Sequence, residues 1–196
     1  MTSFRQDSYS HVLIGDFVDA ADRLKSSDNP VNRRSLVRAT FSAVEGLLWR
    51  LKQEVFAHAV GWAALSIHEQ AALLEETFAV DPNGQVKSQP RFLPTATSIR
   101  LTIRAAQRIS PAYTLDFSHP GWQRLQSAID VRHRIIHPKD LASLTVTDEE
   151  IANCMGGFHW LLALCIEVRD EIKADLEKRL SQMQYSFEHK KKVLDS

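Results

Sequence analysis

The chain has only two cysteines, Cys154 and Cys165, which lie eleven positions apart in a helical pattern. This spacing places them on roughly the same face about three turns apart, which is too far for a disulfide between residues of one straight helix. We therefore expect two small core residues in a reducing compartment, with no disulfide between them.

The chain also lacks an excess of charge of either sign. Its 24 Lys and Arg residues balance 24 Asp and Glu residues. Bulk electrostatics therefore does not indicate a nucleic-acid binder, and any basic surface must be local. No apolar run approaches the roughly 20 residues that span a bilayer, and the polar N-terminus lacks the apolar stretch of a signal peptide. We expect a cytoplasmic protein.

Glycine and proline are scarce, with seven of each, and they cluster between long periodic segments. This distribution predicts an all-α protein, an antiparallel bundle of about five to six helices. We expect one helical domain over residues 1–180, because no linker or low-complexity tract divides the chain. Residues 181–196 are expected to form a charged C-terminal extension, either a solvated helix or a frayed end.

Apolar periodicity and stop signals place the individual helices. Capping-box patterns, Ser66 with Glu69 and Thr147 with Glu150, mark the starts of the third and the last helix. We expect the stretch over residues 87–94 to be a loop, after a turn over residues 81–84. The expected helices cover residues 8–25, a long segment from residue 30, then 66–80, 97–109, 120–137 and a longest helix from residue 147 onward.

An unusual cluster of ionisable side chains ends the helix expected over residues 120–137. It reads Arg132-His133-Arg134-Ile135-Ile136-His137-Pro138. Arg132 takes a place in the apolar stripe of this helix, so a helical wheel turns it inward. An inward arginine needs a carboxylate or phosphate partner, and Glu45, with apolar neighbours, is a candidate. On helix geometry alone, the favoured interpretation is an Arg132–Glu45 pair that fixes helix packing.

Two other interpretations concern the histidines. His133 and His137 are four positions apart, so both can project from one face and could share zinc. The zinc hypothesis lacks a nearby glutamate base and a third ligand, so we expect no metal and no other cofactor. Cleavage of RNA instead needs a base near the 2′-hydroxyl, an acid for the departing 5′-oxygen and a cation for the phosphorane charge, roles that suit histidine and arginine. A symmetric dimer would supply two copies of these groups.

The segment Arg132–Pro138 resembles the R-x4–6-H motif of HEPN-domain proteins. In that superfamily the arginine is commonly followed by a polar residue, here His133, and the closing histidine is frequently followed by proline. The segment Arg38-Ala-Thr-Phe-Ser-Ala-Val-Glu45-Gly-Leu-Leu also resembles their long early helix, where an acidic residue interrupts an apolar run. The resemblance covers an HEPN-like core over about residues 31–170.

The resemblance implies a homodimeric helical bundle with facing Arg–His motifs. Many relatives are metal-independent endoribonucleases in toxin–antitoxin, phage-defence or RNA-processing systems. By that resemblance, Arg132 would bind and stabilise phosphate, His137 would act as acid or base, and His133 would orient the site or the substrate. Arg134 and Lys139 are further candidates for contacts to RNA phosphates.

The resemblance also leaves alternatives open. Some HEPN proteins are non-catalytic and bind nucleotides or partner proteins, so a binding module of the same fold is the alternative function. An antitoxin or a nucleotidyltransferase would be a possible partner. Pro138 and Lys139 stand where one subgroup has a tyrosine, so regulation by nucleotide transfer to such a tyrosine is not expected.

Two further features have more than one interpretation. Gly156 and Gly157 lie inside the last helix, where each costs about 1 kcal/mol relative to alanine. They indicate a close approach of helices, either at a dimer interface or within the bundle.

A basic ridge at i, i+4 and i+8 could follow an RNA backbone, but more often such a ridge is a solvated face. It comprises Arg100, Arg104 and Arg108.

Overall fold

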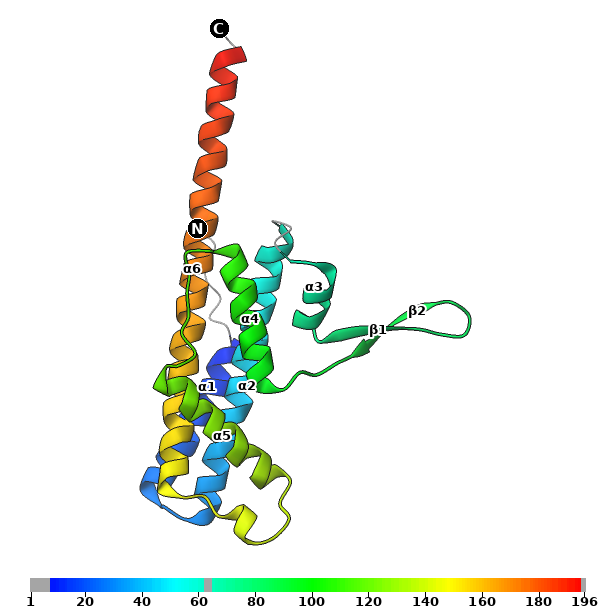
Figure 1. Cartoon of the computed structure of the whole chain (residues 1–196). Helices are drawn as coiled ribbons and strands as arrows, with labels where there is room; N and C mark the ends of the chain where they lie inside the picture. The colour runs from blue at the N-terminus through cyan, green and yellow to red at the C-terminus, as the bar shows by residue number, and fades with distance from the viewer. Residues whose placement is uncertain (1–7, 62–64, 195–196) are drawn as a thin grey trace. The chain divides into compact units, whose positions relative to one another are not determined.

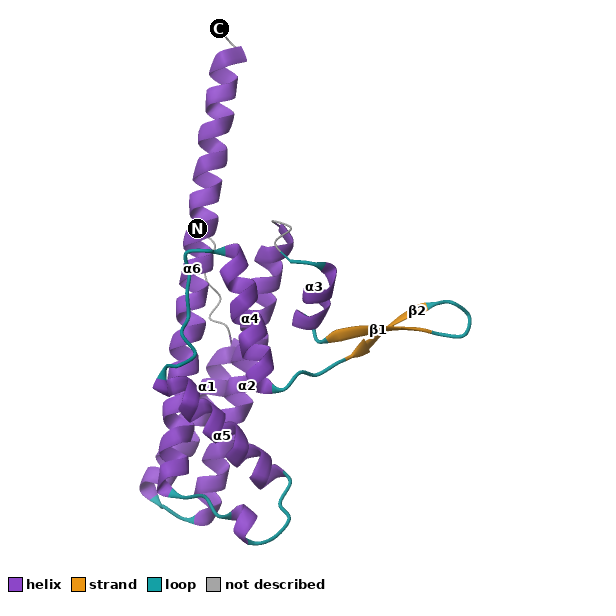
Figure 2. Cartoon of the chain, in the orientation of Figure 1, coloured by secondary structure: helices purple, strands orange, loops and turns teal. Residues whose placement is uncertain are grey.

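The computed structural model describes residues 8–61 and 65–194, and most of them are helical (Figures 1 and 2). The helices are α1 (Ser8–Ser26), α2 (Pro30–Gly61), α3 (Ile67–Leu73), α4 (Thr95–Ile109), α5 (Pro120–Ile136) and α6 (Asp148–Leu194), with a short 3-10 helix η1 (Ala142–Leu144). Strands β1 (Glu76–Val80) and β2 (Val86–Pro90) form a small antiparallel sheet. The prediction of a mainly helical protein is confirmed.

The chain divides into two compact units, each made of separate segments. The first lies within Met1–Leu51, Leu93–Ile99 and Asp116–Cys165, and the second within Lys52–Phe92, Arg100–Leu115 and Ile166–Ser196. The region over residues 1–180, expected as one helical domain, thus contributes to both units. The charged extension expected after residue 180 continues α6 as a helix as far as Leu194.

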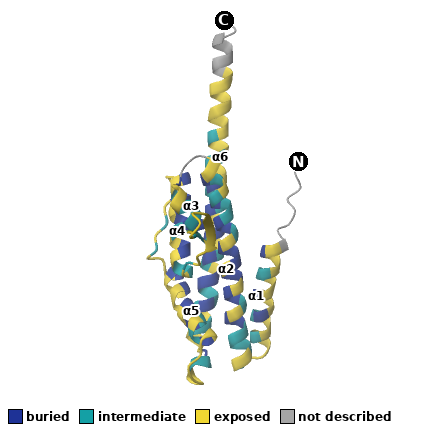
Figure 3. Ribbon diagram, turned by 90° about the vertical axis from the view of Figure 1, so that its right-hand side faces the viewer, coloured by how far each residue is buried: buried dark blue, intermediate teal, exposed yellow. Residues whose placement is uncertain are grey.

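The first unit has a core of side chains from α1, α2, α5 and α6. Phe17 of α1 packs on Phe158 of α6 with ring centroids 4.2 Å apart. Trp122 and Leu125 of α5 are almost completely buried, and Figure 3 shows that buried residues recur along each of these helices. Burial of such side chains stabilises the fold by about 1.5–3 kcal/mol each. Both cysteines are free and buried in this unit, and burial raises the pKa of Cys154 to about 11.

The second unit contains the end of α2, most of α4, the later part of α6, and α3 with the hairpin. The capping box at α3 is present, because Ser66 and Glu69 exchange side-chain-to-backbone hydrogen bonds. The prediction that this helix runs to about Val80 is wrong, since α3 ends at Leu73. Glu75 has a positive φ of 58°, which turns the chain out of the helix and into β1.

The hairpin also corrects the loop expected over residues 87–94, because residues 86–90 form β2. The turn between the strands carries Gly84 at a φ of 78°, and the carboxylate of Asp81 accepts from the backbone N–H groups of Asn83 and Gln85. These bonds fix the register in which Val80 lies opposite Val86. Helical spacing was thus outweighed by turn chemistry and by the β-favouring residues of β1.

Over Asp148–Glu188, α6 satisfies length and composition criteria for a membrane-spanning helix. Its most apolar 18-residue window has a mean hydropathy of 1.4, and 39% of that window is buried inside the protein. A core helix of a soluble protein meets the same criteria. The single helix is therefore weak evidence for a membrane span.

Candidate functional site

The Arg–His motif lies at the C-terminal end of α5, in the first unit. The helix starts where the ring Nδ1 of His119 accepts a hydrogen bond from the backbone N–H of Gly121 at 3.0 Å, with Pro120 in the first turn. It ends at the cap residue His137, whose φ of −119° is not helical and which is followed by Pro138. The prediction of a helix from about Pro120 to about His137 is confirmed.

Arg132 and Glu45 lie together, as helix geometry had suggested. The Nη2 of Arg132 donates to the Oε1 of Glu45 at 2.9 Å, which joins α5 to α2. The side chain of Arg132 is 26% exposed and that of Glu45 is 48% exposed. Because water reaches both groups, such a pair contributes only about 0–1 kcal/mol. The Nε of Arg132 is buried and has no hydrogen-bond partner in the described part of the chain.

His133 and His137 are both exposed. Within residues 8–61 and 65–194, neither imidazole makes a side-chain hydrogen bond or ion pair. The backbone N–H of His137 donates to the carbonyl of His133 at 3.0 Å. The described residues contain no group of three or more His, Cys, Asp or Glu side chains that could hold a metal ion. Both imidazoles are accessible to solvent.

Arg134 binds the connection that follows the motif. Its Nη2 donates to Oε1 of Glu150 at 2.5 Å, near the start of α6. Its Nη1 faces backbone carbonyls at 3.4, 3.2 and 2.6 Å, which belong to Ala142, Ser143 and Thr145. The other oxygen of Glu150 completes the capping box expected at Thr147. The guanidinium that was a candidate phosphate ligand is therefore engaged by the protein itself.

Lys139 lies just past the motif and is exposed. Its ammonium group makes no ion pair with any residue that the structure describes. The turn around it is ordered by Asp140, whose carboxylate accepts from both the backbone N–H and the hydroxyl of Ser143 at 2.7 Å. These hydrogen bonds lower the pKa of Asp140, the hydroxyl contributing most. Of the two additional phosphate candidates, only Lys139 thus presents an unengaged cation.

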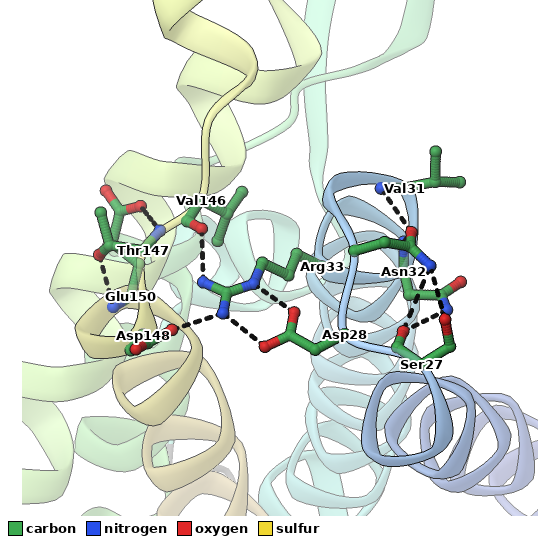
Figure 4. A network of polar contacts seen from close by, with 10 residues as sticks. Ser27, Asp28, Val31, Asn32, Arg33, Val146, Thr147, Asp148 and Glu150 are labelled. Atoms are coloured by element: carbon green, nitrogen blue, oxygen red, sulfur yellow. Dashed lines mark hydrogen bonds and ion pairs between the residues drawn. The ribbon is translucent and has the colours of Figure 1, made fainter.

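A second arginine cluster holds the same connection from α2, and no pattern in the sequence pointed to it. Arg33 donates from Nε to Asp28 at 2.6 Å and from Nη1 to the carbonyl of Val146 at 2.9 Å, and it also bonds Asp148 (Figure 4). The hydrogen bond from Arg33 lowers the pKa of Asp28, and the two carboxylates raise that of Arg33. The α1–α2 turn is thereby fixed to the start of α6.

Arg34 adds one more contact, from Nη1 to the carbonyl of Leu144 at 3.2 Å. A groove of about 410 Å³ lies beside these arginines, lined by Pro30, Arg33, Arg34, Leu141 and residues 144–146. The motif residues Arg132, His133 and His137 do not line it. The groove is therefore a feature of the connection and not of the Arg–His cluster.

The two glycines of α6 pack closely on α5 in the same unit. A Cβ at Gly157 would lie 2.7 Å from the Cα and 2.8 Å from the backbone nitrogen of Leu125. A Cβ at Gly156 would instead meet the side chain of Arg124, at 2.9 Å from its Cδ. The close approach expected from the glycine pair is thus found between helices of one chain.

The basic ridge of α4 belongs to the second unit and is exposed at all three arginines. Arg108 is paired with Glu69 at 2.6 Å. The ridge and the Arg–His motif therefore lie in different units of the chain.

Comparisons of this chain with family models, with curated proteins and with solved structures gave no match.

Proposed function

We propose that this protein is a metal-independent endoribonuclease of the HEPN type, acting as a cytoplasmic homodimer on RNA. The observation that supports the proposal best is the grouping at the end of α5. Two exposed imidazoles without side-chain partners in the described structure stand on the same helix end as Arg132, a partly exposed arginine. A toxin–antitoxin or phage-defence context, with an antitoxin or nucleotidyltransferase partner, is part of this proposal.

In the proposed reaction, an imidazole takes the proton of a ribose 2′-hydroxyl, whose oxygen attacks the adjacent phosphorus. The 5′-oxygen of the next nucleotide leaves and takes a proton from an imidazolium, so a cyclic phosphate and a 5′-hydroxyl result. Histidine suits both steps because its unperturbed pKa lies near neutrality. His137 acts as acid or base, His133 orients the substrate, and the second copy in the dimer supplies the other proton-transfer group.

Arg132 has the role of binding the scissile phosphate and stabilising the charge that develops on it. Its present partner, Glu45, is about half exposed, so a phosphate can compete for the guanidinium at little cost. Lys139 is the further cation proposed for the RNA backbone. Arg134 is proposed to have a supporting role, because its donors already hold the η1 connection and Glu150.

A non-catalytic binding module is the second candidate function, and the Arg132–Glu45 pair favours it. In this case the pair holds α5 against α2, and no substrate displaces Glu45. The two candidates differ in what loss of Arg132 does. For the binding module, we expect Arg132→Ala to lower the melting temperature and the wild type to leave RNA intact. For the ribonuclease, we expect Arg132→Ala to lose cleavage while its fold stays intact.

The test is cleavage of mixed-sequence RNA by the full chain in excess EDTA, compared with Arg132→Ala and His137→Ala. We expect the wild type to leave products with cyclic phosphate ends and both variants to lose cleavage by at least about 100-fold, the usual scale for removing an acid–base group. Arg23→Ala and His68→Ala are matched controls, because both residues are exposed and lie outside the motif.

Circular dichroism and thermal melts of each variant separate loss of chemistry from loss of fold. Cleavage that requires a metal ion, or that survives both motif substitutions, would contradict the ribonuclease. If the wild type leaves RNA intact and Arg132→Ala lowers the melting temperature, the binding module is the better account. An unchanged melting temperature with intact RNA would count against both.

A further inference from the structure

The later part of α6 presents a line of apolar side chains that the described residues leave uncovered. All residues from 180 to 188 are exposed, including Leu180 at 49%, Met183 at 58% and Phe187 at 77%. Leu176, one turn earlier, is partly buried. We call Leu176, Leu180, Met183 and Phe187 the seam. Water-exposed apolar groups arranged in a line on one helix indicate an interaction surface.

The spacing of the seam is that of a two-stranded coiled coil. Successive members are four, three and four residues apart, which is the alternation of the two apolar positions in a heptad repeat. The stripe is one side chain wide, narrower than the face by which a helix packs into a globular core. The seam therefore fits a single partner helix lying along it.

The surface between the seam residues has the shape that receives a side chain of a partner helix. A hollow of about 450 Å³ is lined by Leu180, Met183, Gln184, Phe187 and Glu188. The first four of these stand at positions i, i+3, i+4 and i+7. Four residues at these positions form the hole into which a knob of the facing helix inserts in a coiled coil.

The order of spacings allows a second copy of this helix to be the partner. A pattern of four, three and four reads the same in both directions, so an antiparallel copy of the helix presents matching layers. In that register Leu180 faces Met183 of the second copy, and Leu176 faces Phe187 of the second copy. Each apolar residue of the seam then meets an apolar residue, and Leu180 of the second copy lies over the hollow.

The polar residues beside the seam are compatible with the same register. Glu177 comes next to Gln184 of the second copy, and Arg179 comes next to Ser186 of the second copy. No like charges are opposed at these flanking positions, and Arg179 already pairs with Asp175 of its own helix. A contact of this kind is isologous, because the same patch is used by both copies.

We infer that two copies of this chain associate through an antiparallel coiled coil formed by the α6 seam over residues 176–187. This contact goes beyond the proposed ribonuclease function and does not rest on it, since the Arg–His motif lies elsewhere in the sequence and in the other unit. The contact is small compared with a standard interface of about 800 Å² per partner. Association through the seam alone is therefore expected to be reversible and dependent on concentration.

The test is sedimentation velocity of the full chain over a range of concentrations. We expect the average mass of the wild type to rise with concentration, and that of Met183→Glu and of Phe187→Glu to stay below it because one association step is lost. Tyr185→Glu is the matched control, because it also replaces an exposed aromatic residue by glutamate but lies on the opposite face of the helix. This control is expected to associate to the same extent as the wild type.

Circular dichroism shows whether each variant keeps its helix content. If a glutamate variant loses helix content, Met183→Ser replaces it in the sedimentation test. A wild type whose mass does not change with concentration would overturn the inference, and so would seam variants that associate to the same extent as the wild type. RNA cleavage by the same samples is a separate readout, so failure of the seam and failure of the ribonuclease proposal can be told apart.

Disulfide trapping tests the antiparallel direction. Leu180→Cys mixed with Met183→Cys is expected to form mixed disulfides faster than either variant forms a disulfide with itself. The native Cys154 and Cys165 are buried and do not interfere. Faster self-trapping of each single variant would indicate a parallel pair and overturn the antiparallel register.

Discussion

Replacing Gly157 by alanine adds one methyl group where α6 packs against the backbone of α5. That methyl carbon would lie 2.7 Å from the Cα and 2.8 Å from the backbone nitrogen of Leu125. Neither atom can move away by changing a rotamer, and Leu125 is fully buried. The two helices must therefore separate or the substituted residue must be strained.

Two opposing effects set the size of the change. Alanine inside a helix is favoured over glycine by about 1 kcal/mol. Inserting a methyl group into a tightly packed contact costs about 1–3 kcal/mol, and contact with backbone places this site toward the upper end. We expect Gly157→Ala to lower the free energy of unfolding by about 1–2 kcal/mol, or the melting temperature by about 2–4 °C per kcal/mol for a chain of this size.

The neighbouring Gly156 is a matched control. A methyl group there would meet the side chain of Arg124, at 2.9 Å from Cδ and 3.0 Å from Nη1. Arg124 is exposed and flexible, so it can swing away at little cost. The gain in helix propensity then dominates, and Gly156→Ala is expected to be neutral or to stabilise by up to about 1 kcal/mol.

The assay is urea unfolding of both variants and the wild type, followed by circular dichroism. Opposite shifts of the two midpoints, with the same slope against urea, are the expected result. If both substitutions stabilise the protein, the α5–α6 contact is looser than the structure has it. If both destabilise it by the same amount, side-chain flexibility at Arg124 does not decide the outcome, and the reasoning fails.

Two further predictions concern the connection between α5 and α6. Arg134→Met removes the hydrogen bonds to the η1 carbonyls and to Glu150. It is expected to lower the free energy of unfolding by about 2 kcal/mol, because bonds from a charged donor are worth about 1.5–3 kcal/mol before the discount for partial exposure. A thermal melt measures this loss against Arg38→Met, an exposed control, and equal melting temperatures would refute the role of Arg134 in holding the connection. The pKa of Asp28 is lowered in the folded state by Arg33, so its stabilising effect is present above the ordinary value of 3.8 and is lost as the pH falls below it. Melts from pH 6 to pH 2 should therefore converge for Asp28→Asn and the wild type at the acid end, and a constant difference would contradict the pairing.

The starts of α3 and α6 and the end of α5 could be predicted from sequence because local chemistry decides them. Ser66 and Thr147 cap their helices through hydrogen bonds over three residues, and Pro138 excludes continuation of α5 for steric reasons. The sequence pattern did not predict the hairpin, because local turn chemistry outweighs the helical spacing there. Residues 76–80 satisfy helical spacing, but the positive φ at Glu75 and the turn after Val80 commit them to a strand.

The candidate site was predictable only in part. The inward position of Arg132 follows from its place in a helical stripe, and the same pattern pointed to Glu45 across 87 positions of sequence. The different roles of Arg132 and Arg134 did not follow, because two arginines on one helix end look alike in sequence. Arg134 meets carbonyls of η1 whose orientation depends on how the connection folds.

The sequence by itself determined the helical character of this protein and the place of the Arg–His motif at a helix end. These features depend on periodicity and on contacts between residues a few positions apart. Only the tertiary structure decided that Arg33 and Arg134 hold the connection after the motif, and that Gly157 lies against the backbone of Leu125. Those contacts join residues far apart in the chain, and their partners are set by how the helices pack, which no local pattern encodes.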